Sequence, residues 1–491
     1  MANVDVAGIH RPAGTLDAAG ALRPYGGPWN ERLAAHLMRR AGFGGSPDEI
    51  RAMAAMSPAE AVGSLIHFPS TANMPQPADV FDPVAYLRGQ FGNQRPADMT
   101  EDQKRERNKG LRMQERQSVL ALQAWWLDRM LNSPAPLQEK MALYFHGHFT
   151  SAAIQKGVTP PMVLAQNQLF RSNALGNLRE LTRGVSKDPA MLIYLDNALN
   201  VATHPNENYA RELMELFTLG VDHYTENDVR ESARAWSGWT VFRRTGEAGF
   251  VGTRHDDGTK TFLGKTGNFN GDDIVDIIFE QPQAATFFAG SLLNYFVYND
   301  PEPALVDAVA ALIRKHDFEL APVMSTLLRS DVFFSERAYR ALVKSPAEFV
   351  VGAHKALGLT TLDPTAQRGM NQMGQILFYP PNVAGWPGGQ NWVTSQMVIA
   401  RQNYVAGLVN SQVMAQSSWL PSVPMTAGPA AAALIASILQ GDASPLATAQ
   451  LASYLNGASE SALGMLSGEN RDERVRGAAY LTMAMPAFQL A

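Results

Sequence analysis

Apolar side chains recur at helical spacing along most of this chain. In residues 29–41 they lie three and four positions apart, which is the spacing of one face of an α-helix. Residues 118–131 are apolar on nearly every side, as in a helix buried in a core. The pattern predicts further helices at 133–145, 160–174, 176–183, 187–199, 205–219, 226–237, 272–279, 283–297, 303–315, 319–329, 335–357 and 367–377. The fold class is therefore predicted to be mainly α.

Three stretches interrupt the helical pattern. Residues 240–264 are rich in Gly, Thr and aromatic side chains and predict a short β-hairpin insertion. Residues 379–392 contain three prolines and three glycines, which exclude a helix and predict a long ordered Pro/Gly/Trp loop. Residues 1–28 have no periodicity and predict a flexible N-terminal arm. Residues 29–491 are predicted to form one large helical domain that ends in helices over 425–491.

Composition and charge narrow the classes of function. The formal net charge of the 491-residue chain is −5, too small to attract nucleic acid or an anionic membrane over long range. Cysteine is absent, which excludes disulfides, thiolate metal sites and cysteine nucleophiles. No apolar run reaches the roughly 18 residues of a membrane span, and the first residues lack the pattern of a signal peptide. We therefore expect no nucleic-acid partner and no membrane span, while the location stays open.

His146 and His148 form the first candidate site. On a continuous helix, side chains two residues apart point about 200° from each other and cannot share a ligand. Gly147 makes a helix end plausible here, and on an extended segment both imidazoles would point the same way. A converging pair would suit a divalent metal ion such as zinc. The alternative is that both histidines satisfy backbone groups at a helix end.

Glu207, Arg211 and Glu215 form a charged ladder at i, i+4 and i+8, within an arc of about 80°. Such a ladder is most often a surface face of ion pairs. Only 18% of the chain is charged, however, so the ladder favours a buried face directed at His146 and His148. Two buried carboxylates beside an arginine would bind a cation or perform acid–base catalysis. His255, at the tip of the predicted hairpin, is either a further catalytic group or part of a polar turn.

Aromatic side chains form the last candidate site. Trp239, Trp386 and Trp392 lie among Gly, Pro and amide residues, and Asn391 precedes the last of them. Indole faces beside amides suit sugar rings and predict substrate binding, although a tryptophan can equally fix a loop to the core. The common motifs of dinucleotide, phosphate-loop, serine-hydrolase and zincin sites are absent from the sequence.

These segments resemble a bacterial family of large proteins designated domain of unknown function, number 1800. The resemblance spans about residue 30 to the C-terminus. Its segments are HLMRRAGFG (36–44), EKMALYFHGHFTS (139–151), QNQLFRSNALGN (166–177), SKDPAMLIYLDN (186–197), PNENYARELMELFTLGVDHYTENDV (205–229), HDDGTKTFLG (255–264), LVKSPAEFVV (342–351), PPNVAGWPGGQNW (380–392) and MPAFQL (485–490). The family typically shows a Trp-His-Asn-His-Phe segment, which reads Phe-His-Gly-His-Phe here. The resemblance implies proteins that are often exported and often encoded beside a sulfatase-like family.

Two functions fit these observations. The first is a metal-dependent hydrolase acting on a glycan or another polymer or glycoconjugate. The second is a non-catalytic glycan-binding or assembly protein that works with a sulfatase-like partner. In the first, His146 and His148 would hold the metal, and the ladder with His255 would supply the acid–base groups. The hydrolase requires these histidines and glutamates to meet in one cleft, whereas the binding protein requires only the aromatic surface.

Overall fold

The computed structural model describes residues 18–69, 71, 74–77, 80–91, 96–242, 245–457 and 469–491. The mainly α prediction is confirmed. The first half contains α1 (Ala18–Ala21), α2 (Glu31–Arg40), α3 (Pro47–Ala54), α4 (Pro58–Ile66), α5 (Pro83–Phe91), η1 (Pro96–Asp98), α6 (Glu101–Asn132), α7 (Pro136–His148), α8 (Pro160–Ser172), α9 (Leu178–Ser186), α10 (Pro189–Tyr194), η2 (Asn197–Leu199), α11 (Asn208–Glu212), η3 (Leu213–Thr218) and α12 (Glu226–Ala235). Of these, η3 is a π-helix, and η1 and η2 are 3₁₀ helices.

The second half begins with the strands and continues with helices. Its elements are β1 (Trp239–Val241), β2 (Ala248–Phe250), η4 (Gly252–Arg254), β3 (Lys260–Phe262), β4 (Lys265–Gly267), α13 (Gly271–Glu280), α14 (Pro282–Phe296), α15 (Pro303–Lys315), α16 (Leu320–Leu328), α17 (Pro346–Ala356), α18 (Ala366–Gln372), η5 (Gly389–Val393), α19 (Ser395–Val409), α20 (Gln412–Ala415), α21 (Trp419–Ser422), α22 (Ala427–Leu439), α23 (Pro445–Asn456), α24 (Glu469–Ala484) and α25 (Pro486–Gln489).

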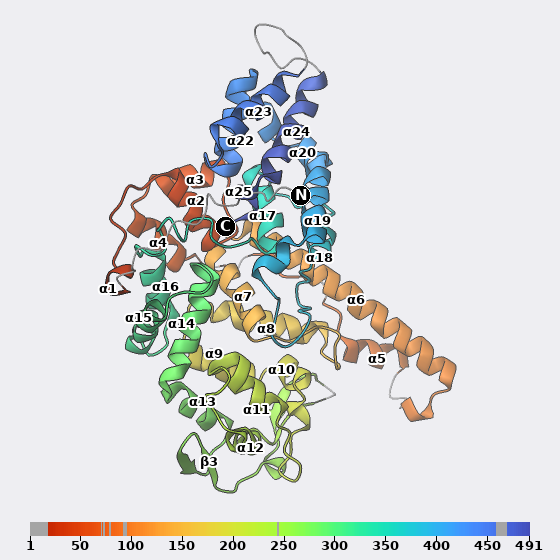
Figure 1. The fold of residues 1–491 in the computed structure, drawn as a ribbon. Helices are drawn as coiled ribbons and strands as arrows, with labels where there is room; N and C mark the ends of the chain where they lie inside the picture. Colours follow the sequence, from red (N-terminus) through yellow and green to blue (C-terminus); the bar gives the residue numbers. More distant parts are fainter. Residues whose placement is uncertain are drawn as a thin grey trace.

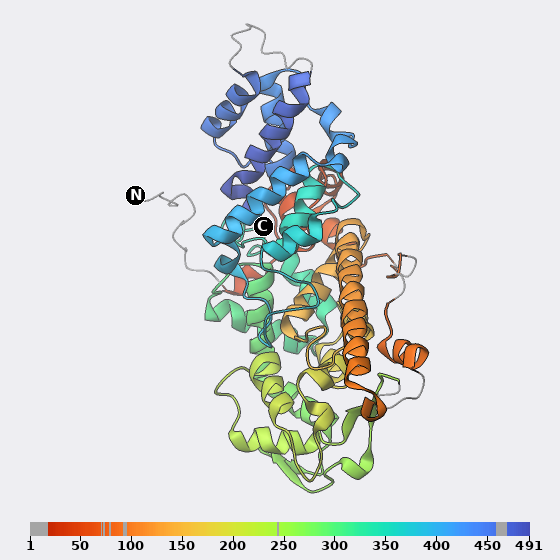
Figure 2. The ribbon, with the colours of Figure 1, turned by 90° about the vertical axis from the view of Figure 1, so that its right-hand side faces the viewer.

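The described chain forms an elongated body (Figures 1 and 2). One end carries α22, α23 and α24, and the opposite end carries α12 and the strands. The long helix α6 packs on the body with its C-terminal half and projects from it with its N-terminal half, beside α5. Helix α7 runs through the middle of the body.

Local sequence explains where many helices begin. In a capping box, the N-cap side chain accepts the N3 backbone N–H, and the N3 side chain accepts the N-cap N–H. Within the described ranges, six helices start this way, with the pairs Ser46/Glu49, Ser57/Glu60, Thr100/Gln103, Thr225/Asp228, Asn270/Asp273 and Ser345/Glu348. Each N-cap contributes about 1 kcal/mol to helix stability.

Two predicted helices differ from the structure at their starts. The segment 335–357 is helical only from Pro346, and residues 331–340 form successive turns instead. Arg340 has a φ of 50°, and the residue before a proline is disfavoured in helical conformation, so the helix cannot extend backwards. The segment 205–219 becomes helical only at Asn208 and continues as the π-helix η3.

The β insertion consists of two hairpins. Strand β1 pairs antiparallel with β2, with Trp239 opposite Phe250, and β3 pairs antiparallel with β4, with Thr261 opposite Thr266. Each strand is three residues long, so the hairpins depend on their packing against α12 and η2. The insertion predicted at 240–264 is therefore real, and it extends to Gly267.

Residues 18–28, the last part of the predicted N-terminal arm, pair through their backbone with the chain before α17. The backbone N–H of Tyr25 donates to Arg329, and the N–H groups of Asp331 and Val332 donate to Arg23 and Ala21. The Tyr25 ring lies 5.0 Å from the ring of Phe334, between centroids. A segment without periodicity thus gains its order from backbone partners that are distant in sequence. The rest of the predicted arm, 1–17, lies outside the described residues.

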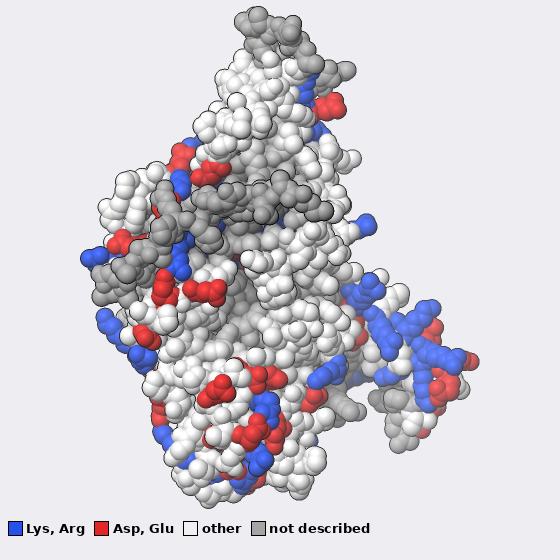
Figure 3. All heavy atoms as spheres, in the orientation of Figure 1, with Lys and Arg blue, Asp and Glu red and all other residues white. Residues whose placement is uncertain are grey.

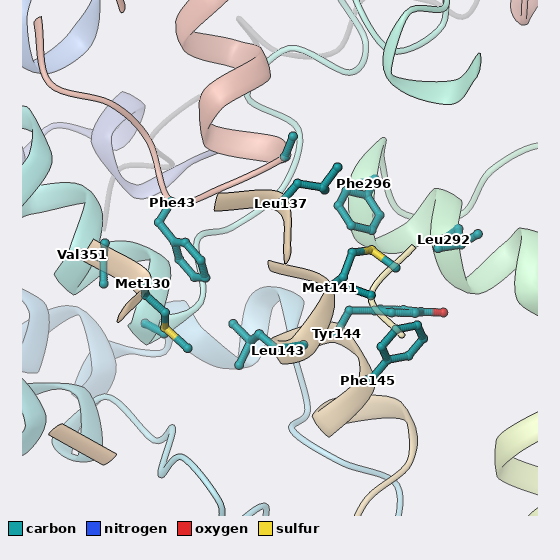
Figure 4. Close-up of a cluster of buried hydrophobic side chains, with 14 of the residues drawn as sticks. Phe43, Met130, Leu137, Met141, Leu143, Tyr144, Phe145, Leu292, Phe296 and Val351 are labelled. Carbon is teal, nitrogen blue, oxygen red and sulfur yellow. The ribbon is translucent and has the colours of Figure 1, made fainter. Parts of the chain in front are cut away.

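The core is one continuous cluster of buried apolar side chains, and α7 lies inside it. Every residue of α7 from Leu137 to His146 is buried. Figure 4 shows side chains of α7 between those of α14 and those of α6 and α17; the labelled residues are Phe43, Met130, Leu137, Met141, Leu143, Tyr144, Phe145, Leu292, Phe296 and Val351. The division of the chain into an arm and one large domain stays a prediction.

Charged side chains are unevenly distributed over the surface. In the view of Figure 3 they gather on the projecting part of α6 and over the end that carries α11, α12 and β3. The part of this face between them is mostly free of charge. None of the described helices is both long and apolar enough to cross a membrane.

Candidate functional site

The two histidines of the Phe-His-Gly-His-Phe segment lie on one continuous helix, because α7 runs to His148. Because the helix ends only at His148, no break between the two histidines allows their side chains to converge. The imidazole of His146 packs against Trp126 and Phe170, on the side of α6 and α8. The imidazole of His148 packs against Phe288 of α14 and Phe217 of η3. The two rings therefore point to different sides of α7, as helical geometry requires.

His146 belongs to the aromatic core. Its Nε2 lies 3.1 Å from the amide nitrogen of Asn167, which donates to it, so Nδ1 carries the ring proton. No partner for that N–H occurs among the described residues. Burial, with a smaller effect from the Arg171 guanidinium, lowers the pKa of His146 to about 3. His146 is thus a neutral side chain of the core.

His148 is partly buried and lies at the wall of a cleft. Its Nε2 lies 2.8 Å from the backbone carbonyl oxygen of Phe217. A carbonyl can only accept, so Nε2 carries the proton and Nδ1 remains an acceptor. Burial lowers the pKa of His148 to about 4, although the bond to Phe217 opposes this shift. His148 is therefore a neutral imidazole at physiological pH.

A metal site made from both histidines does not fit this arrangement. Nε2 of each ring already has a hydrogen-bond partner from the protein, and the two rings have different neighbours. The described ranges contain no group of three or more His, Asp or Glu side chains that could hold a metal ion. The pairing that we expected from His146 and His148 is therefore not formed.

The charged ladder lies at the surface, contrary to our expectation of a buried face. Arg211 makes a two-pronged ion pair with Glu226 of α12, at 2.7 and 2.8 Å, and a longer contact of 3.4 Å with Glu207. The side chain of Glu207 is 40% exposed, and that of Glu226 is 64% exposed. Glu215 accepts the hydroxyl of Tyr224 at 2.9 Å. The ladder thus joins α11 to α12 at the surface, and its carboxylates do not meet His146.

His255 and Trp239 lie in the hairpin region and do not line the cleft beside His148. The Nδ1 of His255 donates to the carbonyl oxygen of Ser237 at 2.9 Å, and its ring packs against Phe250. The Trp239 ring also packs against Phe250, and the Lys187 ammonium lies 5.5 Å from it. The polar-turn interpretation accounts for His255, and Trp239 fixes the first hairpin.

The loop over 379–392 folds against the end of α7. A Cβ at Gly385 would lie 2.2 Å from the carbonyl oxygen of Gly147, so only glycine allows this approach. Gly385 also has a φ of 86°, which favours glycine. The buried Arg401 donates to the carbonyl oxygens of Trp392 and Lys344, at 3.1 and 2.6 Å. The loop is therefore anchored at both its middle and its end.

This anchoring places two tryptophans at a cleft of about 870 Å³ between the loop, α7 and α14. Trp386 and Trp392 are both partly buried, and Asn391 is exposed at the same wall. The indole N–H groups of the two tryptophans are shielded from solvent and have no acceptor within the described chain. The loop is ordered, as the sequence predicts, and it lines the same cleft as His148.

The opposite wall contains residues that sequence reasoning missed. Ser291, Asn294 and Tyr295 of α14 line the cleft, together with Tyr144 of α7. The Tyr144 hydroxyl donates to the Ser291 hydroxyl at 2.8 Å, and burial raises the pKa of Tyr144. The signal was a polar stripe at i, i+3 and i+4 on a mainly apolar helix. Asn299, after α14, adds a second amide to this wall.

Two carboxylates also line the cleft. Glu348 forms an ion pair with the buried Lys140 and accepts the backbone N–H of Ser345 at 2.6 Å. Burial acts to raise the pKa of Glu348, but Lys140 and the bonds from Ser345 outweigh it and hold that pKa below its usual value. Asp300, by contrast, is exposed, and the ion pairs within the described chain do not include it. Among the described residues of this cleft, Asp300 is therefore a carboxylate without an ion pair.

Comparisons with known proteins identify the family of the chain but no activity. No match was found among curated proteins or among solved structures. The model of the family described as "Protein of unknown function (DUF1800)" matches residues 36–490. This match covers nearly the whole length, and it includes α7, the ladder and the loop of the cleft. The chain therefore belongs to the family DUF1800.

Proposed function

We propose that this protein binds a glycan in the cleft between α7, α14 and the loop over 379–392. The observation that carries the proposal is the pair of partly buried indoles, Trp386 and Trp392, that line one wall of the cleft. Indole faces pack against the apolar faces of sugar rings. Two such rings on one wall would hold a sugar by stacking.

The other wall supports the same ligand class. Tyr295, Asn294 and Asn299 supply a ring and amides, and Nδ1 of His148 supplies an acceptor for a hydroxyl. A cleft that combines aromatic side chains with hydrogen-bonding groups is typical of a small-molecule or sugar site. Its volume of about 870 Å³ lies within the usual range for such sites.

The geometry supports the binding protein over the metal-dependent hydrolase. The hydrolase needs His146, His148 and the ladder in one place, and these groups lie on different sides of α7 and at the surface. Assembly with a sulfatase-like partner stays a prediction that rests on the resemblance alone.

An array of defined oligosaccharides, followed by calorimetric titration of each hit, tests the proposal on the full chain. Trp386→Ala and Trp392→Ala should each weaken binding about tenfold to a hundredfold, because each removes a large buried contact. Trp239→Ala is the matched control, since it removes a partly buried indole outside the cleft and should leave affinity unchanged. Circular dichroism checks that the variants are folded. The absence of any hit, or variants that bind as tightly as wild type, would overturn the proposal.

A further inference from the structure

We infer that the cleft selects glycans that carry no acidic groups, with neutral sugars or amino sugars as its ligands. This inference rests on the proposed glycan-binding function and adds the chemical class of the sugar. Three observations carry it: which charged side chains line the cleft, whether each of them has an ion-pair partner, and which ring nitrogen of His148 carries the proton.

No lysine or arginine lines the cleft within the described residues. A carboxylate or sulfate group that leaves water needs charged hydrogen bonds in return, and arginine and lysine are the side chains that usually provide them. Lys140 is buried and is already paired with Glu348. An acidic sugar would therefore lose hydration in this cleft without a compensating cation.

His148 does not replace the missing cation. Its Nε2 proton is used by the carbonyl oxygen of Phe217, and its Nδ1 is an acceptor. The ring is surrounded by aromatic side chains, which disfavour a second proton. At neutral pH it can accept a hydroxyl of the ligand but cannot offset an anionic group.

Asp300 adds a negative charge to the same wall. It follows α14 and is exposed, and its backbone N–H donates to the side chain of Asn294 at 3.0 Å. No ion pair formed by the described residues neutralises its carboxylate. A free carboxylate repels uronate and sulfate groups and attracts an ammonium group, and indole faces also attract ammonium groups. The wall therefore disfavours acidic sugars and accepts neutral and amino sugars.

Three oligomers with the same β-1,4-linked backbone test this selection on the full chain: glucose oligomers, glucosamine oligomers and glucuronate oligomers. They are titrated together with the hits of the oligosaccharide array, each hit being compared with its acidic counterpart. We expect acidic forms to bind at least about tenfold more weakly than their neutral or amino counterparts at low salt. An acidic form that binds as tightly as its counterpart would overturn the inference while leaving the proposed function intact. An array without any hit would instead refute the proposed function itself.

The substitution Asp300→Asn removes the negative charge of this side chain but keeps its size and shape. Asparagine tolerates the φ of 53° at this position, so the loop should keep its conformation. We expect the ratio of the affinities for neutral and acidic oligomers to be about threefold to tenfold smaller in the variant than in wild type. Added salt should reduce this difference between the two proteins. Asp307→Asn on α15, also exposed but outside the cleft, is the matched control and should change nothing. An unchanged ratio in Asp300→Asn would overturn the role of Asp300.

Discussion

Two helices carry most of the polar residues that the sequence singles out, and the fold uses them in opposite ways. Helix α7 has few charged residues, and they are buried: Glu139 is fully shielded and accepts hydrogen bonds from Arg129 and Arg171, each at 2.9 Å. Helix α11 with η3 has a dense ladder of charges, and its ion pairs to α12 are exposed. The cleft lies at the end of α7, whereas the ladder forms exposed ion pairs that join α11 to α12.

This difference shows that a high density of charged residues in a sequence does not identify a functional site. Charges at i, i+4 and i+8 share one face wherever that face points, and here it points outward. What makes the end of α7 a candidate site is the approach of a distant loop, allowed by Gly385 against Gly147. Four predictions test the contrast between α7 and the exposed ladder, from the largest expected effect to the smallest.

Glu139→Gln should destabilise the protein most. The substitution removes the negative charge that Arg129 and Arg171 share in the core, and leaves two buried guanidinium groups without a counter-charge. Such a loss costs about 3–5 kcal/mol. Urea unfolding, followed by circular dichroism, measures it. The matched variant Glu207→Gln breaks an exposed pair and should cost less than about 1 kcal/mol. Equal costs for the two variants would contradict the contrast between the helices.

Gly385→Ala should disrupt the cleft, whereas Gly389→Ala should not. Both positions have a positive φ, 86° and 56°, so both variants cost about 1–2 kcal/mol in backbone conformation. Only at residue 385 would the new Cβ meet the carbonyl oxygen of Gly147, since the space at Gly389 is open. We expect Gly385→Ala to lower the melting temperature further and to lose the binding of array hits. Binding retained in Gly385→Ala would show that the close approach does not build the cleft.

The end of α7 should make the protein sensitive to acid. Burial lowers the pKa of His148 to about 4, below its unfolded value near 6.5, so the folded state favours the neutral ring. The stability that this provides is present above pH 6.5 and is lost as the pH falls toward 4. The loss is on the order of 3 kcal/mol.

His148→Gln isolates this contribution, because the amide can still donate to Phe217 but does not titrate. Thermal melts between pH 4 and pH 8 should show a shallower acid slope in the variant than in wild type. Identical slopes would remove His148 from the acid response. Elemental analysis of the same samples shows whether the histidine also affects metal content.

Arg211→Ala should have the smallest effect. The side chain is 34% exposed, and its pairs with Glu226 and Glu207 are open to solvent and to salt. We expect a cost of no more than about 1 kcal/mol, reduced further at high salt, and no change in the affinity for glycans. Weaker glycan binding by this variant in a calorimetric titration would show that the ladder belongs to the binding site.

Local sequence determined much of this fold. Helical periodicity and capping boxes such as Thr225/Asp228 gave the mainly α architecture, and the Gly- and Pro-rich composition gave the loop over 379–392. These signals depend on the residue itself and on its neighbours within a turn or two, so they can be read without the fold. The same reasoning explains why His146 and His148 diverge once α7 is known to continue through them.

Tertiary structure alone decided which polar residues meet. The sequence does not show whether the face of Glu207 and Arg211 lies inside or outside, because that depends on helices packed from elsewhere in the chain. Nor does it show that α14 supplies Ser291 and Asn294 to the wall facing Trp386, or that residues 18–28 pair with 329–332. Each of these contacts joins segments far apart in sequence, and only the shared hydrophobic core brings them together.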